Sequence, residues 1–216
     1  MISGLPPGRR HLIVMAKAPR LGRVKTRLAH DIGRVPAWSF YRRTLARVLR
    51  PLATDPRWTL WLAVAPDVSK GQPRVWSVEC RRLGQGGGGL GQRMARMFTQ
   101  PPPGATVMIG ADIPAVRPHH IWRAFRALEG RDAVFGPADD GGYWLVGLGQ
   151  RRRRIDIFAN VRWSTEDALA DTMANVPPHW RIATIDTLAD VDDGAGYADH
   201  LLEDRKIGAM TFSGSD

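Results

Sequence analysis

Cysteine is nearly absent from this chain, and long apolar runs are missing. Cys80 is the only cysteine among 216 residues, which excludes an internal disulfide and any zinc site built on paired cysteines. No apolar stretch approaches the roughly 18 residues of a membrane span. The opening sequence, MISGLPPGRRHLIVMA, has no apolar segment of signal-peptide length before its first charges. We therefore expect a cytoplasmic protein without a membrane span.

Several common catalytic signatures are missing as well. The six histidines show no metal-binding spacing such as H-E-x-x-H, and there is neither a G-x-S-x-G elbow nor a G-x-x-x-x-G-K-[ST] phosphate loop. Gly86, Gly88 and Gly91 match G-x-G-x-x-G, but no acidic ribose partner follows about 20 residues later at the end of a second strand. The glycine-rich stretch is therefore better interpreted as a flexible loop before a helix.

Basic residues outnumber acidic ones, giving a formal net charge of +10. Such an excess bears on association and solubility rather than on fold. The run Arg151 to Arg154 follows an apolar segment without any aromatic stacking pattern, so a solvated loop is favoured over a nucleic-acid contact.

Apolar and polar segments alternate in a way that predicts an α/β fold. A hydrophobic content of 44% and a charged content of 24% are typical of globular proteins. Strands are predicted at 11–16, 58–65, 76–80, 106–109, 133–136, 143–148 and 181–185. Helices are predicted at 24–32, 36–52, 92–98, 118–128 and 164–175, the last with Ser164 as N-cap and Asp167 completing a capping box. This order predicts a single-domain, Rossmann-like, doubly wound mixed sheet in which 143–148 could run antiparallel.

The domain boundaries follow from the same pattern. We expect the domain to span 11–205, after an N-terminal extension at 1–10. The chain from Ala195 is predicted to be helical and then a frayed tail over 206–216.

Five cations follow the first predicted strand, in the segment MAKAPRLGRVKTRLA: Lys17, Arg20, Arg23, Lys25 and Arg27. In open α/β sheets, ligands bind beyond the carboxyl ends of the strands, so this cluster suits a phosphate chain. Arginines at loops are commonly only solvated, which is an equal alternative for Arg20 and Arg23. Lys17, Lys25 and Arg27 are the stronger predictions, and Lys25 is also a catalytic candidate.

Two acidic motifs complete the candidate site. GADIP places Asp112 at the end of a buried strand, where a carboxylate can ligate Mg²⁺ or Mn²⁺ or, equally, cap a turn. GPADDGGYWLVGL places Asp139 and Asp140 before two glycines that allow a sharp turn and a close approach to a ligand. By itself the second motif is explained by an ordinary hairpin turn, but the presence of GADIP in the same chain favours a functional turn.

Together these strings resemble a family of uncharacterised bacterial transferases of the glycosyltransferase-A type, within the nucleotide-diphospho-sugar transferase superfamily. The resemblance covers nearly the whole chain. Besides the strings above it includes LGQRMARMF, RWSTEDAL at Arg162 to Leu169 and ADVDD at Ala189 to Asp193. The KTRL portion is also similar to guanylyltransferases that activate phospholactate or phosphoenolpyruvate.

The resemblance implies a nucleotide over the first strands and a metal held by Asp112. It puts Asp140 at the family's acidic position, as a metal ligand and catalytic residue, and Asp139 at a variable one. Gly91, after the glycine loop, is expected among the nucleotide contacts. The family has acidic residues where this chain has Gly89 and Gln92, so polar contacts from this loop to the base or ribose are not expected.

Two reactions fit these residues equally well. A nucleoside triphosphate could pass its nucleotidyl group to a small phosphorylated acceptor, or a sugar nucleotide could pass its sugar to an acceptor, with Mg²⁺ or Mn²⁺ and the cations neutralising charge in both cases. The non-enzymatic alternative is a polyanion- or RNA-binding protein. The acidic motifs argue against it, because they would repel a phosphate backbone.

Overall fold

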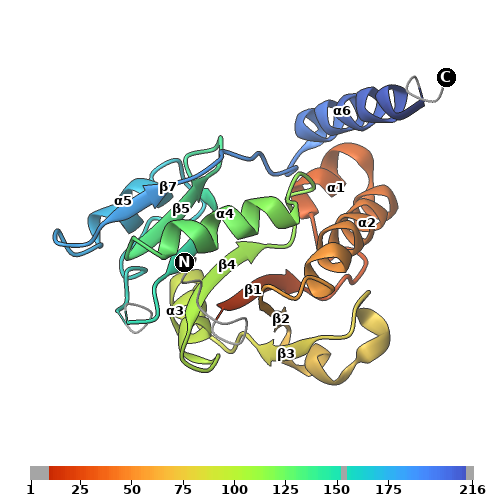
Figure 1. The fold of residues 1–216 in the computed structure, drawn as a ribbon. Coiled ribbons are helices and arrows are strands. Elements are labelled where there is room, and N and C mark those ends of the chain that lie inside the picture. The colour runs from red at the N-terminus through yellow and green to blue at the C-terminus, as the bar shows by residue number, and fades with distance from the viewer. Residues whose placement is uncertain (1–9, 152–154, 213–216) are drawn as a thin grey trace.

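The computed structural model of the chain describes residues 10–151 and 155–212. One seven-stranded sheet forms its centre, in the order β3-β2-β1-β4-β6-β5-β7 (Figure 1). The strands are β1 Arg10–Lys17, β2 Thr59–Ala65, β3 Arg81–Gly84, β4 Ala105–Gly110, β5 Ala133–Pro137, β6 Tyr143–Leu148 and β7 Ile182–Thr184. Only β6 runs antiparallel to its neighbours, β4 and β5, as its sequence allowed. The predicted α/β class and mixed sheet are therefore confirmed.

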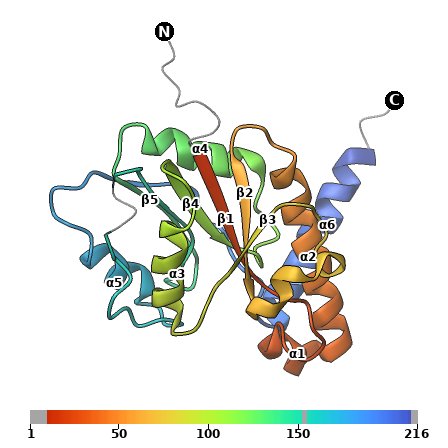
Figure 2. The same cartoon turned by 90° about the horizontal axis from the view of Figure 1, so that it is seen from below.

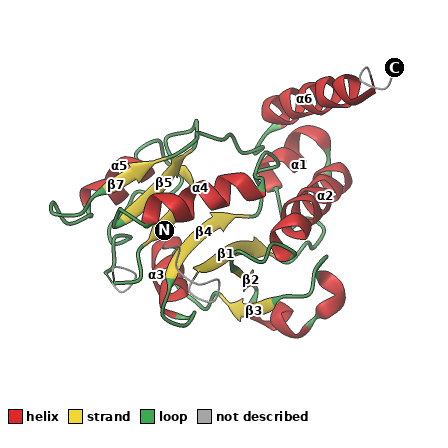
Figure 3. Cartoon of the chain, viewed as in Figure 1, coloured by secondary structure: helices red, strands yellow, loops and turns green. Residues whose placement is uncertain are grey.

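Helices cover both faces of this sheet (Figures 2 and 3). They are α1 Thr26–Ile32, α2 Arg34–Ala53, α3 Leu90–Thr99, α4 Pro118–Leu128, α5 Ala168–Ala174 and α6 Gly194–Phe212, and two 3₁₀ turns, η2 Asp67–Gly71 and η3 Pro73–Val75, precede β3. Successive side chains of a strand point to opposite faces. Leu12 and Val14 therefore join the apolar core beneath α2 and α4, whereas Ile13 joins the core beneath α3 and α5.

Two local predictions are wrong. The strand expected at 76–80 lies instead at Arg81–Gly84, because Trp76 is buried against the core and its indole N–H donates to the carbonyl oxygen of Ser69 at 2.9 Å. The helix expected from Ser164 begins only at Ala168, with Asp167 at the N-cap position and no side-chain cap. Ser164 has a positive φ of 63°, which is incompatible with the extended N-cap geometry that was expected.

The ends of the chain are only partly described. Of the predicted extension at 1–10, only Arg10 lies within the described residues, and it begins β1. Residues 152–154 of the arginine run and 213–216 of the predicted tail lie outside them. Among the helices of the described ranges, none has both the length and the apolar character needed to cross a membrane.

Candidate functional site

The sheet topology brings four separate chain segments to one edge. Parallel β1 and β4 end side by side, with Met15 opposite Gly110, so the loop after β1 lies next to Asp112. Because β6 is antiparallel to β4, its first residues and the turn before it, with Asp140, lie at the same edge. Strand β7 is parallel to β5, so the segment that follows it also returns to this edge with Asp190 and Asp192.

Three carboxylates meet there. Asp112, Asp190 and Asp192 each have an oxygen that lies within 4.8 Å of the other two. The Lys25 ammonium bridges two of them: its Nζ is 2.9 Å from Asp112 Oδ2 and 2.9 Å from Asp192 Oδ1. Carboxylate oxygens are ligands that Mg²⁺ and Mn²⁺ prefer, so the cluster can hold a divalent metal whose other positions water or substrate would fill.

Backbone geometry directs Lys25 into this cluster. It precedes α1 with a φ of 45°, a left-handed conformation that non-glycine residues rarely adopt. Its side chain is only 3% exposed. Burial lowers the pKa of Lys25, but Asp112 and Asp192 outweigh burial and raise that pKa above its usual value, so the ammonium stays charged. Strain of this kind is often kept at functional sites.

Asp190 is the most perturbed of the three carboxyl groups. Burial and the neighbouring carboxylates raise its pKa to about 6, against the opposing effect of Lys25. Asp192 behaves differently: burial raises its pKa, but the contacts with Lys25 and Arg27 prevail and lower it. Burial is the largest cause of this shift, so the raised pKa marks a carboxyl group withdrawn from water beside other carboxylates, where a bound cation would stabilise the charged form.

A cavity of about 740 Å³ adjoins the cluster, and several cations are among the residues that line it. Lys17, Lys25, Arg27 and Arg93 line it, together with Asp112 and Asp192. The Lys17 backbone is fixed because its N–H donates to Tyr41 Oη at 3.0 Å and its carbonyl oxygen accepts from that hydroxyl at 2.9 Å. The cavity thus combines a carboxylate cluster with cations placed for a ligand that carries several negative charges.

Gln85 and Arg93 form part of the same cavity and were not singled out from the sequence. The buried Gln85 amide donates to the carbonyl oxygens of Ala16 and Ala63, at 3.3 and 2.9 Å, and its Oε1 accepts from Arg93 Nη1 at 3.0 Å. Arg93 Nε is buried and has no hydrogen-bond partner among the described residues. Because this nitrogen is covered, Arg93 contributes positive charge to the cavity rather than a free donor from Nε.

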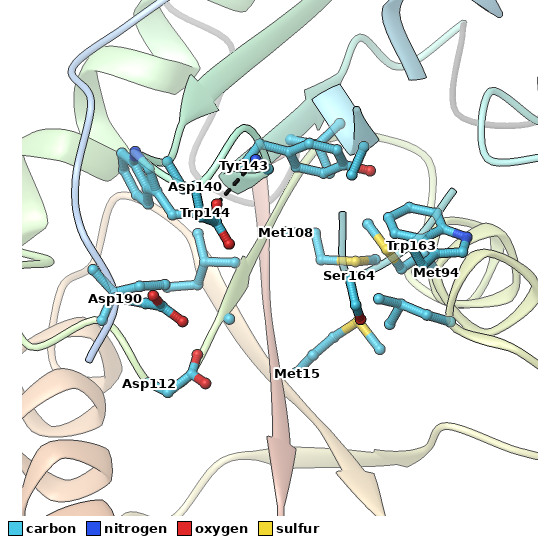
Figure 4. Close-up of a pocket in the computed structure, with 18 of the residues that line it drawn as sticks. Met15, Met94, Met108, Asp112, Asp140, Tyr143, Trp144, Trp163, Ser164 and Asp190 are labelled. Carbon is cyan, nitrogen blue, oxygen red and sulfur yellow. Dashed lines mark hydrogen bonds between the residues drawn. The ribbon is translucent and has the colours of Figure 1, made fainter. Parts of the chain in front are cut away.

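A second, smaller cavity of about 260 Å³ adjoins the first, sharing Met15, Asp112, Asp140 and Trp163 with it. In Figure 4 the carboxylates of Asp112, Asp140 and Asp190 lie on one side. The methionine wall, which we define as Met15, Met94 and Met108, lies on the other side next to Trp163. The cavity therefore has one acidic side and one apolar side.

Asp140 is held by its own turn. Its Oδ1 accepts the backbone N–H of Gly142 at 2.9 Å. Gly141 has a φ of 80°, and a Cβ at that position would collide with the backbone of Glu166. The predicted acidic turn with glycines is therefore present, and it presents the exposed Asp140 carboxylate at the junction of the two cavities.

The remaining predicted residues differ in position. Arg27 lines the larger cavity but pairs with Asp192 at 3.3 Å, while Arg20 is exposed and lines neither cavity. Gly91 is buried and also lines neither: a Cβ there would be 2.5 Å from the carbonyl oxygen of Phe158, which gives this glycine a packing role. Gln92 Oε1 accepts the N–H of Gly89 at 3.1 Å and so caps α3, in keeping with a loop that offers no acidic contact.

Asp190 and Asp192 are the main residues that sequence reasoning missed. Both belong to the string ADVDD, which contributed to the family resemblance but was given no role. Asp140 lies outside the set of three carboxylates and remains a predicted ligand. The signal was present in the sequence, but nothing in it placed a segment 78 residues after Asp112 against that side chain.

Known proteins support this architecture. The family described as "Uncharacterized protein conserved in bacteria (DUF2064)" matches residues 48–165, which is more than half of the chain and includes Asp112 and Asp140. No curated protein sequence matches the chain significantly.

Three solved structures illustrate the likeness. A protein from Desulfovibrio desulfuricans G20, assigned to the nucleotide-diphospho-sugar transferases, is 27% identical with a TM-score of 0.77 over 85% of this chain and 82% of that one. The 4-diphosphocytidyl-2C-methyl-D-erythritol synthase of Anaerococcus prevotii DSM 20548 is 10% identical with a TM-score of 0.59 over 91% and 99%. The manganese complex of Rv0371c from Mycobacterium tuberculosis H37Rv is 15% identical with a TM-score of 0.54 over 90% and 98%.

The last two of these likenesses concern the fold alone, and the first extends to sequence. The chain therefore belongs to the DUF2064 family and has the fold of the nucleotide-diphospho-sugar transferases and nucleotidyltransferases.

Proposed function

We propose that this protein is a metal-dependent glycosyltransferase that takes its sugar from a nucleotide-diphosphate sugar. One observation carries the proposal: the cation-lined cavity opens directly on the carboxylate cluster of Asp112, Asp190 and Asp192. Cations and a carboxylate-bound metal are together suited to a diphosphate, whereas either one alone has simpler explanations.

The carboxylate cluster fits Mg²⁺ or Mn²⁺. In octahedral coordination with a bond length of about 2.1 Å, neighbouring oxygens lie about 3.0 Å apart and opposite ones about 4.2 Å apart. The three carboxylate oxygens, which lie within 4.8 Å of one another, would therefore have to draw together by side-chain rotation when the ion binds. A metal bound there would neutralise the negative charge that develops on the departing nucleoside diphosphate. The manganese complex of a protein with the same fold supports this choice of ion.

Each cation has a distinct part in this scheme. Lys25 shares its carboxylates with the proposed metal, so we expect its ammonium to turn to the diphosphate when the metal binds. Lys17, Arg27 and Arg93 line the same cavity and add positive charge to it. Donors that are already in place stabilise a transition-state charge at little reorganisation cost.

The smaller cavity favours glycosyl transfer. It lies beside the proposed metal position, and no lysine, arginine or histidine is among the described residues that line it. Aromatic side chains and carboxylates suit an uncharged sugar, because hydroxyl groups can donate to carboxylates while C–H faces pack on rings. The acceptor hydroxyl would attack the anomeric carbon as the bond to the diphosphate oxygen breaks. Asp140, exposed at the junction of the cavities, would accept the hydroxyl proton.

Nucleotidyl transfer is the second candidate. The observation that favours it is the number of cations after β1, since Lys17, Lys25 and Arg27 could share the charge of a departing pyrophosphate. In this reaction an acceptor phosphate attacks the α-phosphorus of a triphosphate, and pyrophosphate leaves. The acceptor phosphate would then need its own cations, and the described lining of the smaller cavity offers none.

Product analysis separates the candidates. Phosphorus NMR of the protein with Mg²⁺, UDP-glucose, GDP-mannose or dTDP-glucose, and a panel of hydroxyl acceptors should reveal a nucleoside diphosphate. The four nucleoside triphosphates with sugar phosphates or small phosphorylated acids should give no pyrophosphate. The reverse result would establish nucleotidyl transfer.

A binding experiment tests the site itself. Titration calorimetry with UDP, GDP, CDP and dTDP should show an affinity that EDTA abolishes. The variant Asp112→Asn should behave like the EDTA sample, while Asp139→Asn should match the parent, because Asp139 is exposed and lines neither cavity. Metal-independent binding of RNA or heparin, with no nucleotide binding, would instead support the polyanion-binding alternative.

A further inference from the structure

We propose that the smaller cavity selects an uncharged sugar that lacks a hydroxyl group on the edge facing the methionine wall, as in a deoxysugar. This inference rests on the proposed function and names the class of group that is transferred. It comes from the opposite chemistry of the two sides of one small cavity: carboxylates on one side, and Met15, Met94 and Met108 on the other (Figure 4).

The charge of the lining excludes acidic sugars. Asp112, Asp140 and Asp190 all face this space, and no described residue that lines it is basic. The proposed metal would neutralise part of the negative charge of Asp112 and Asp190, but the donor diphosphate would take up the remaining positive charge of that ion. Asp140 has no cation partner among the described residues, so a carboxylate or phosphate on the sugar would face a like charge. Unpaired like charges are an effective means of rejecting a ligand.

The methionine wall excludes hydroxyl groups on the other side. Met15 and Met108 lie on the adjacent strands β1 and β4, where Ile13 is opposite Met108, and both belong to the core beneath α3. Leu90 and Met94 lie one turn apart on α3 and close the wall. A thioether sulfur is only a weak acceptor, so a hydroxyl that faces the three methionines exchanges its hydrogen bonds to water for weaker ones, although the exposed Ser164 hydroxyl also lies on this side, beside Met15 (Figure 4). A methyl or methylene group would pack without that cost.

The size of the cavity limits the occupant. A volume of about 260 Å³ is below the roughly 300–1,000 Å³ of cavities that take drug-sized ligands. It suits a single ring. Trp163, beside the methionine wall, adds a flat apolar surface of the kind on which the C–H face of a ring packs.

Matched donors test this inference by calorimetry in the presence of Mg²⁺. The first pair is dTDP-glucose and dTDP-6-deoxyglucose, and the second is UDP-glucose and UDP-glucuronic acid. Since an apolar pocket rejects an added hydroxyl by up to about 100-fold, we expect dTDP-6-deoxyglucose to bind about 10- to 100-fold tighter than dTDP-glucose. UDP-glucuronic acid should bind at least about tenfold weaker than UDP-glucose. Equal affinities within either pair would overturn the inference.

Methionine methyl NMR locates the sugar. The methyl signals of Met15, Met94 and Met108 should shift with dTDP-6-deoxyglucose more than with dTDP alone. The signal of Met97, which is buried in the same core but does not line the cavity, is the internal control. If the three signals respond equally to dTDP and to the sugar nucleotide, the sugar lies elsewhere and the inference fails.

A charge placed in the cavity should reverse its selectivity. Ser164 is exposed and lines both cavities, so Ser164→Arg should raise the affinity for UDP-glucuronic acid by about tenfold, whereas the neutral control Ser164→Gln should not. If the nucleoside diphosphates bind with Mg²⁺ but the sugar has no influence in any variant, this inference fails while the proposed nucleotide site stands. If no nucleotide binds at all, both fail.

Discussion

Replacing Lys25 with methionine should make the protein bind Mn²⁺ more tightly in the absence of nucleotide. The Lys25 ammonium contacts Asp112 and Asp192 at 2.9 Å each, and both carboxylates belong to the proposed metal site. A metal must therefore displace two charge-assisted contacts before it can bind. Methionine has a similar length but no charge, so the metal would meet the carboxylates without competition.

The size of this effect follows from the exposure of the partners. The side chains of Asp112 and Asp192 are 38% and 42% exposed, which places each contact near the upper end of the exposed-pair range, at about 1 kcal/mol. Two contacts give about 2 kcal/mol, or roughly a 30-fold increase in Mn²⁺ affinity. Repulsion among the carboxylates left behind acts in the same direction.

Calorimetric titration of Mn²⁺ at pH 8, well above the raised pKa of Asp190, measures the change. Lys17→Met is the matched control, because Lys17 lines the same cavity but forms no ion pair among the described residues, and it should change the affinity by less than about threefold. Thermal melting should show that Lys25→Met folds, with Mn²⁺ restoring any lost stability. An unchanged or weaker Mn²⁺ affinity in a folded Lys25→Met protein would refute the proposed competition between the Lys25 ammonium and the metal for the carboxylates.

Four further outcomes are expected. In the same Lys25→Met variant kcat should fall by a larger factor than KM rises, because the contact that Lys25 makes with the leaving diphosphate strengthens as charge develops there. Steady-state kinetics with the identified donor measures both constants, and a change confined to KM would contradict this role. Asp140→Asn should reduce turnover by at least about 100-fold with less than about 1 kcal/mol of destabilisation, and a loss of cooperative melting would instead indicate a structural role. The pKa of Asp190 is raised to about 6 in the folded protein from 3.8, so Mn²⁺ affinity should fall about tenfold per pH unit below pH 6, while protonation between about pH 6 and 4 should stabilise the metal-free protein. Mn²⁺ titrations and thermal melts from pH 4.5 to 8 measure these two trends, and an Mn²⁺ affinity and melting temperature that do not change with pH would exclude Asp190 as the titrating ligand. Gly91→Ala should lower the free energy of unfolding in urea by about 1–3 kcal/mol, because the added Cβ would collide with the Phe158 carbonyl oxygen. An unchanged urea midpoint would mean that the 158–163 segment moves to accommodate the methyl group without cost.

Local patterns in the sequence were sufficient for most of the elements. Strand β4 could be predicted because a continuous apolar run is typical of a strand buried on both faces, and helix α4 could be predicted because Pro118 marks its first turn. The strand expected at 76–80 failed because Trp76 meets the same apolar criterion while serving as a buried anchor between turns. The helix expected from Ser164 failed because a good capping residue was assigned without knowledge that the backbone there has a positive φ.

The candidate site was predictable in part for the same reason. Lys17, Lys25 and Asp112 were found because each follows a predicted strand, and the ends of parallel strands meet at one edge of a sheet. Asp140 was found from its glycine-rich turn. The carboxylates of Asp190 and Asp192 follow a three-residue strand, β7, and the pairing of that strand with β5 cannot be derived from local pattern.

The sequence by itself determined the α/β class, the order of the elements and the presence of cations and carboxylates after the strands. These properties depend on residues close together in the chain, whose periodicity and turn chemistry act locally. Only the tertiary structure decided which carboxylates gather around Lys25, that its ammonium bridges them, and that an acidic side and a methionine wall face each other across one cavity. Those relations join strands β1, β4 and β6, helix α3 and the segment after β7. They arise from strand pairing and core packing between residues far apart in sequence, which no local pattern specifies.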